Sequence, residues 1–201
     1  TVLQRILAIS AAAMLAPTAV RAQPIRPWVI AQIVDTTAQQ QDVSKDYLIG
    51  SRAAWQEINA KGGINGRKLK LIVEDSAYNP TKAVQVAQKL VNQDKVFVVA
   101  GSIGTVVNNA AMPVQFEKNV MKFAPLTGAR DMFEPVNKLK FAILDDYYGS
   151  MKEHAPVLYK KVNAKKACIL HQDDEFGLEV VQAYMRHVQD NAEESVRDRK
   201  S

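Results

Sequence analysis

Two hydroxyl side chains stand in a glycine-rich loop with the composition of an anion-binding site. Residues 101–105 read Gly-Ser-Ile-Gly-Thr and follow an apolar run, residues 96–100, that is typical of a buried strand. Apolar residues at helical spacing begin directly after the loop. The first N–H groups of a helix favour a negative charge, and Ser102 and Thr105 would stand beside them. We therefore predict a ligand loop here, at the carboxyl end of a strand in an open α/β sheet.

The same loop resembles a nucleophile elbow in which alanine replaces the first glycine. Short motif matches arise often by chance, so we prefer binding and predict that the chain is not an enzyme. The histidines lack metal-ligand spacing, and the full dinucleotide-binding glycine motif is missing from the sequence, so we expect neither metal nor cofactor. A hydrolase based on Ser102 would have to draw its acid and its histidine from Asp145, Asp146, His154, His171 and His187.

The composition fits a folded domain with a sizeable core. The chain has 201 residues, of which 47% are hydrophobic, and a formal net charge of +5. Residues 1–22 contain two arginines and no acid, so the remainder carries 24 basic against 21 acidic residues. These basic residues are scattered rather than gathered in a stripe with aromatic residues, which argues against nucleic-acid binding.

The first 22 residues have the pattern of a secretory signal peptide. Arg5 precedes the apolar run of residues 6–15, and Val20-Arg21-Ala22 offers a cleavage site after Ala22. The run is shorter than the length of about 20 residues that a membrane-spanning helix needs. We expect cleavage after Ala22 and a mature protein outside the cytoplasm.

Strand and helix patterns alternate over residues 28–124, which predicts a parallel sheet flanked by helices. Strands are expected at residues 28–34, 69–73, 96–100 and 120–124, and a helix from residue 43 or 44 to residue 61. Asn79-Pro80 should begin the next helix. Its apolar face repeats every three or four residues and consists of Ala83, Val86, Ala87, Leu90 and Val91.

The later part of the chain predicts fewer elements. We expect a strand at residues 139–144, a helix at 148–162 that Pro156 kinks or splits, and a buried strand at 167–170 with Cys168 as a small core residue. A further helix should begin near Asp173-Asp174-Glu175, and residues 190–201 read as a solvated or disordered charged tail. The apolar face of that helix comprises Leu178, Val181, Tyr184, Met185 and Val188.

Several of these segments, taken in order, resemble one family. The match includes Ile58-Asn59-Ala60-Lys61-Gly62-Gly63-Ile64-Asn65-Gly66-Arg67, Asp75, the Asn79-Pro80 helix, the loop 101–105 and Asp173-Asp174-Glu175-Phe176-Gly177. Together they resemble the periplasmic leucine/isoleucine/valine-binding family, the type I solute-binding proteins of ABC importers, over residues 28–188.

The resemblance implies an α/β type I periplasmic binding protein fold with two lobes that close over a ligand. The domains would be a signal peptide at 1–22, a first lobe at 23–138, a partial second lobe at 139–189 and a charged tail at 190–201. Family members are substantially longer, so the second lobe of this chain is incomplete.

The resemblance also implies where a ligand would lie. Thr105, with Ser102 close by, would hold a carboxylate, and the loop with Thr127, Gly128 and Ala129 would offer a hydroxyl and backbone groups to an ammonium. Phe176 would pack on the ligand. The acid that usually pairs the ammonium comes from later in the second lobe and has no counterpart here. A polar loop at residues 35–41 stands where members carry a Gly-rich loop, which would change that edge of the pocket.

The function that follows is a periplasmic solute-binding protein. It would capture a branched-chain amino acid or a similar small polar solute for an ABC permease in the membrane. A ligand-sensing subunit of the same fold is the alternative.

Overall fold

The computed structural model describes residues 25–163, 166 and 168–198, with side chains described as far as residue 189. The predicted signal peptide at residues 1–22 lies outside the described residues. Among the helices of the described part, none has the length and apolarity that a membrane crossing requires.

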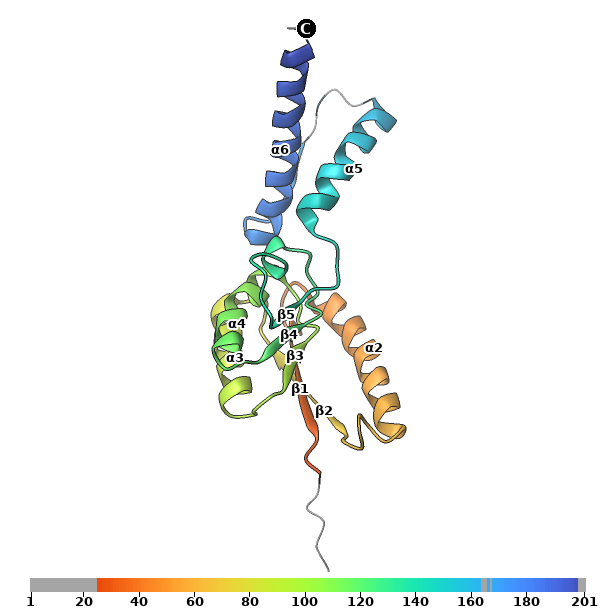
Figure 1. Ribbon diagram of the computed structural model, residues 1–201, viewed down its shortest axis with the longest axis vertical. Coiled ribbons are helices and arrows are strands. Elements are labelled where there is room, and N and C mark those ends of the chain that lie inside the picture. Colours follow the sequence, from red (N-terminus) through yellow and green to blue (C-terminus); the bar gives the residue numbers. More distant parts are fainter. Residues whose placement is uncertain (1–24, 164–165, 167, 199–201) are drawn as a thin grey trace, which may run out of the picture.

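A five-stranded parallel sheet forms the centre of the molecule (Figure 1). Its spatial order is β2-β1-β3-β4-β5. This order places the loops that follow β1, β3 and β4 next to one another at the carboxyl edge of the sheet, because these three strands are neighbours and run in parallel. The strands are β1 (Trp28–Val34), β2 (Leu69–Asp75), β3 (Val98–Ala100), β4 (Met121–Phe123) and β5 (Lys140–Phe141).

Helices cover both faces of the sheet (Figure 1). On one face α3 and α4 pack over an apolar cluster that includes Val86 and Val99, and on the other Trp55 of α2 packs on Ile30 and its neighbours. The last two helices, α5 and α6, lie together beyond the carboxyl ends of the strands. The helices are α2 (Gln41–Ala60), α3 (Pro80–Asn92), α4 (Thr105–Glu117), η2 (Arg130–Met132), α5 (Tyr147–Val162) and α6 (Glu175–Asp198).

The pattern of α3 is confirmed in detail. The side chain of Asn79 accepts a hydrogen bond from the Lys82 N–H at 2.9 Å, and Pro80 occupies the first turn, where its missing N–H costs nothing. All five residues of the predicted apolar face are buried. Burial of this face holds α3 against the sheet and thereby fixes the loop that precedes it.

Helix α2 begins at Gln41, two residues before the predicted start. The buried carboxylate of Asp35 accepts hydrogen bonds from the N–H groups of Thr37, Ala38 and Gln40, at 2.7–3.1 Å. These bonds fold the polar loop after β1 into a compact turn that leads directly into the helix. The loop therefore takes a defined shape at the edge of the sheet, although its sequence is rich in glutamine.

Strand β5 belongs to the same sheet as β1–β4. Residues 140 and 141 pair with residues 122 and 123 of β4, so the strand predicted over 139–144 shrinks to two residues. The predicted lobe boundary between residues 138 and 139 thus falls just before a strand of the central sheet. The division into lobes itself stays a prediction. Helix α5 continues through Pro156 rather than being split there.

The buried strand predicted at residues 167–170 is wrong. The described residues of this segment, 168–170, form no strand, and both Cys168 and Leu170 are exposed. An apolar run becomes a buried strand only beside a neighbouring strand that covers it, and no described strand lies next to this segment.

For the charged tail predicted at residues 190–201, the disordered alternative is wrong over the described part. Residues 190–198 continue α6, and residues 199–201 lie outside the described part. Alanine, glutamate and arginine in this stretch have high helix propensity, so a charged sequence is compatible with a helix. The predicted apolar face of α6 is only partly covered, since Leu178, Met185 and Val188 remain exposed.

Candidate functional site

The hydroxyl groups of Thr105 and Thr127 lie 2.7 Å apart. Thr105 begins α4 after β3, and Thr127 lies in the loop after β4. The two loops are joined by the backbone bond from the Leu126 N–H to the Ser102 carbonyl, 2.8 Å long. The parallel order of β3 and β4 thus brings together two hydroxyls that are 22 residues apart in the sequence. Both threonine residues are almost fully buried.

The start of α4 faces this pair. Gly104 is the N-cap residue, has φ +97° and provides no side-chain cap. A Cβ at this position would lie 2.5 Å from the ring of Tyr78, so only glycine lets the ring approach the helix terminus. An uncapped first turn of this kind suits a carboxylate, because its N–H groups point outward and carry positive partial charge.

A cavity of about 230 Å³ lies at this edge of the sheet. Phe176 enters it from α6 and contacts the ring of Tyr147 edge-on, with ring centroids 5.2 Å apart. The cavity thus combines hydroxyl groups at the sheet edge with aromatic and aliphatic walls, a composition that suits a small solute with one polar end. Its lining residues are Gln40, Val43, Tyr78, Ile103, Gly104, Thr105, Leu126, Thr127, Leu144, Tyr147 and Phe176.

Ser102 lies in the predicted loop but points away from this cavity. Its side chain is fully buried, and Oγ accepts a hydrogen bond from the Ile33 N–H of β1 at 3.2 Å. The hydroxyl therefore ties the loop to the sheet. A nucleophile elbow needs an exposed hydroxyl, so this geometry does not favour the hydrolase interpretation. Two of the histidines that a hydrolase could use, His154 and His171, each bond through Nδ1 to a nearby backbone carbonyl.

Gly128 and Ala129 contact residues of the site through their backbone groups. The Gly128 carbonyl accepts a bond from the Tyr147 N–H at 2.8 Å, and the Ala129 N–H donates to the Thr127 hydroxyl at 3.2 Å. A side chain at residue 128 would collide with the Asp145 carbonyl, at 2.3 Å. Neither residue lines the cavity with Phe176. Ala129 lines a neighbouring cavity of about 420 Å³, which shares Thr105 with the first.

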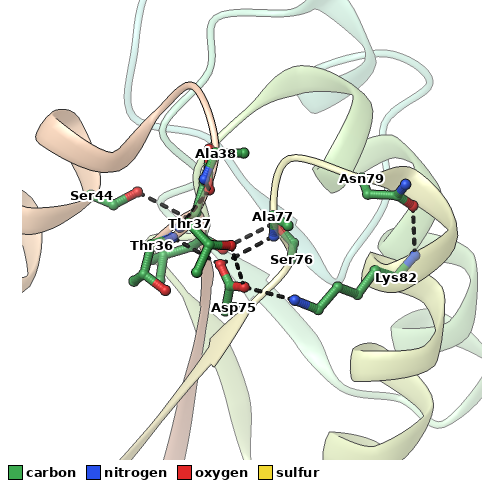
Figure 2. A network of polar contacts seen from close by, with 11 residues as sticks. Thr36, Thr37, Ala38, Ser44, Asp75, Ser76, Ala77, Asn79 and Lys82 are labelled. Atoms are coloured by element: carbon green, nitrogen blue, oxygen red, sulfur yellow. Dashed lines mark hydrogen bonds and ion pairs between the residues drawn. The ribbon is translucent and has the colours of Figure 1, made fainter.

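A network of polar contacts fixes the loops after β1 and β2 (Figure 2). The Asp75 carboxylate accepts bonds from the N–H groups of Thr36 and Ala77, from the Thr37 hydroxyl and from Lys82 Nζ. Desolvation by burial works to raise the pKa of Asp75, but these hydrogen bonds outweigh it and hold that pKa well below its usual value. The network keeps Tyr78, three residues further on, in place over the cavity.

Several lining residues lie outside the segments that the sequence assigns to the site, among them Tyr78 and Tyr147, whereas Gln40 belongs to the polar loop that was predicted to change this edge of the pocket. Tyr78 carried the clearest signal, since it is an aromatic residue in the short loop between the end of β2 and the start of α3. Its backbone has φ +51°, a left-handed conformation that is unusual for a bulky residue and often marks a functional position. Burial, followed by the negative charges of Asp174 and others, raises the pKa of Tyr78 to about 12.

The fold defines a class of protein, namely an α/β protein with a parallel sheet covered by helices and a cavity at the carboxyl edge of that sheet. A family model described as periplasmic binding protein matches residues 27–198. The chain belongs to this family.

Relatives and solved structures agree with this assignment. An amino acid binding protein of Pseudomonas aeruginosa is 30% identical over 149 residues, which cover 70% of this chain and 38% of the relative. The Leu/Ile/Val-binding protein of Escherichia coli is 28% identical over 158 residues, covering 78% of this chain and 41% of the relative. The chain therefore spans less than half the length of these relatives.

The structural neighbours share the fold. A substrate-binding periplasmic protein from Ralstonia solanacearum has a TM-score of 0.75 and 22% identity, over 82% of this chain and 46% of that one. A branched-chain amino acid transporter substrate binding protein from Streptococcus pneumoniae, in complex with isoleucine, has a TM-score of 0.72 and 20% identity, over 80% and 46%. These likenesses support the predicted type I fold with an incomplete second lobe.

Proposed function

We propose that this chain forms the solute-binding part of a periplasmic protein that delivers a branched-chain amino acid, or a similar small polar solute, to an ABC permease. The observation that carries the proposal is the pairing of Thr105 with Thr127 at the uncapped start of α4, within one cavity. The names of the relatives, an amino acid binding protein and a Leu/Ile/Val-binding protein, support the class of solute.

Binding would require no covalent chemistry. The N–H groups of α4 and the Thr105 hydroxyl replace the water around a carboxylate, and Thr127 offers its hydroxyl to the neighbouring polar group. The aliphatic part of the solute contacts Phe176 and Tyr147, which lie edge to face. Hydrogen bonds fix the orientation of the solute, and apolar burial supplies most of the affinity.

Saturation-transfer NMR on residues 23–201 tests this proposal, because it detects weak binding directly. We expect transfer to leucine, isoleucine or valine, and a loss of that transfer in Thr105→Val and Thr127→Val, which remove a hydroxyl at constant shape. Thr81→Val, on the exposed side of α3, is the matched control and should bind like the parent. Equal transfer in Thr105→Val and the parent, or no transfer from any of the three amino acids, contradicts the proposal.

Export is a separate part of the proposal. Residues 1–22, placed behind an added Met and fused to a reporter enzyme that is active only outside the cytoplasm, should give activity in cells. Replacing the apolar residues 6–15 by a polar sequence should abolish it. Reporter activity that survives this replacement contradicts export through this segment.

A further inference from the structure

Glu179 of α6 binds the loop that carries Thr127. Its Oε1 accepts hydrogen bonds from the Arg130 N–H at 2.7 Å and from the Arg130 Nε at 3.0 Å. Glu179 is only 8% exposed, so the carboxylate has little access to water and depends on these two donors. One oxygen thus holds both the backbone and the side chain of the residue three positions after Thr127.

Helix α5 is attached to the same short loop. The guanidinium of Arg130 lies over the ring of Tyr148, 4.3 Å from its centroid, and the Gly128 carbonyl accepts the Tyr147 N–H. The loop of residues 127–130, which follows β4, therefore bonds to both terminal helices. Any shift of α5 or α6 relative to the sheet must break or carry along these bonds.

Phe176 stands one helical turn before Glu179. Residues three apart in a helix share a face, so the segment of α6 that bonds to Arg130 is also the segment that brings Phe176 to the cavity. Asp174 fixes the start of this turn, since its carboxylate accepts the Gly177 N–H at 3.1 Å. The bond from Glu179 to Arg130 therefore links the turn of α6 that carries Phe176 to the loop that carries Thr127.

We infer that Glu179 and Arg130 act as positioning residues for the solute site, because their bond holds α6 so that Phe176 closes the cavity over the two threonines. This inference rests on the proposed function and adds two residues to it. Neither residue needs to touch the solute, since they act through Phe176.

The first claim, that the bond from Glu179 to Arg130 holds α6 in place, can be tested without any solute by measuring the distance between two spin labels. The labels are placed on Gln88→Cys of α3 and Gln189→Cys of α6, in a Cys168→Ser background. We expect one narrow distance distribution in the parent and a broader one in Glu179→Ala and in Arg130→Met. The Arg130 amide should also exchange with solvent at least tenfold faster in Glu179→Ala. Glu153→Ala, an exposed acid on α5, is the control and should leave both measurements unchanged.

The second claim, that this bond acts on the solute through Phe176, is tested by a double-mutant cycle. Glu179→Ala should weaken solute binding at least fivefold in the parent and should have no further effect in a Phe176→Ala background, because the residue acts through Phe176. If Glu179→Ala lowers the affinity equally in both backgrounds, its role is merely structural and the inference is overturned. An unchanged distance distribution in Glu179→Ala also overturns it. If the parent binds none of the solutes, the proposed function fails, while the distance and exchange data still decide whether the bond holds α6.

Discussion

Asp75 of β2 and Lys82 of α3 form an ion pair, with Oδ2 and Nζ 2.6 Å apart, at the point where two loops meet beside the cavity. The same carboxylate binds N–H groups of Thr36 and Ala77, so one side chain joins the ends of β1 and β2 to the first turn of α3. This connection fixes the loop of residues 76–79, which joins β2 to α3 and carries Tyr78.

Replacing Asp75 by Asn should lower the free energy of unfolding by about 2 kcal/mol at pH 7, because a charged acceptor of several hydrogen bonds is lost. The folded-state pKa of Asp75 lies below its usual 3.8, so its contribution is complete above that value and is lost as pH falls further. Urea unfolding at pH 7 and pH 3 measures both effects. Glu57→Gln, which breaks the exposed pair with Lys61, is the control and should change stability by less than about 0.5 kcal/mol. A difference between parent and Asp75→Asn that stays constant down to pH 2 contradicts the argument.

Lys122 is a second charged residue with a measurable effect. It lies on β4 opposite Val99, is fully buried, and its Nζ has no hydrogen-bond partner among the described residues. Desolvation lowers the pKa of Lys122 to about 7 from the usual 10.5. The unfolded chain therefore binds a proton that the folded chain lacks between these two values.

Above pH 10.5 Lys122 is neutral in both the folded and the unfolded chain, so its burial costs no deprotonation. As pH decreases from 10.5 toward 7 this cost grows, and the free energy of unfolding falls. Lys122→Met should therefore gain stability relative to the parent by about 1.4 kcal/mol for each pH unit that the solution is lowered across this window. Chemical denaturation at several pH values measures the difference, and Lys70→Met, an exposed lysine on β2, serves as the control. A difference that does not vary with pH means that Lys122 is charged or hydrated in the folded chain.

The sequence predicted the positions of Thr105 and Thr127 for a reason that needs little tertiary information. Each follows a short apolar strand, and alternating strands and helices force those strands to run in parallel, so their ends meet at one edge. The burial of α3 was equally predictable, because its apolar spacing and its Asn-Pro start agree with each other. Local pattern and global arrangement coincide at these places.

Other features depend on contacts that no local pattern contains. Ser102 and Thr105 share one loop, yet Gly101, with φ +68°, turns the chain so that the Ser102 side chain meets β1. The entry of Tyr147 into the cavity depends on a bond to Gly128, nineteen residues earlier in the sequence. Cys168 was misplaced because an apolar run does not reveal whether a neighbouring strand exists to cover it.

Gly104 should tolerate no side chain. Gly104→Ala would have to hold φ near +97° and displace the Tyr78 ring, so we expect a loss of about 1–3 kcal/mol in the free energy of unfolding. Gly50→Ala is a matched control, since Gly50 lies within α2 with open space around it and should gain up to about 1 kcal/mol. Thermal unfolding of the two variants measures both changes. Equal stability in Gly104→Ala and the parent contradicts the close approach of Tyr78 to the helix terminus.

Tyr78 should reveal its surroundings at high pH. Burial and nearby negative charges, Asp174 first among them, raise its pKa to about 12, so the folded state keeps a neutral phenol where the unfolded state ionises near 10. The contribution of Tyr78 to stability is therefore complete below pH 10 and is lost as pH rises toward 12. Ultraviolet difference spectra between the parent and Tyr78→Phe isolate this residue from the other five tyrosines. We expect the difference to titrate about two pH units above an exposed tyrosine and Tyr78→Phe to lose less stability than the parent between pH 10 and 12. A difference spectrum that titrates near pH 10 means that the ring lies in open water, and then it cannot form a wall of the cavity beside Thr105.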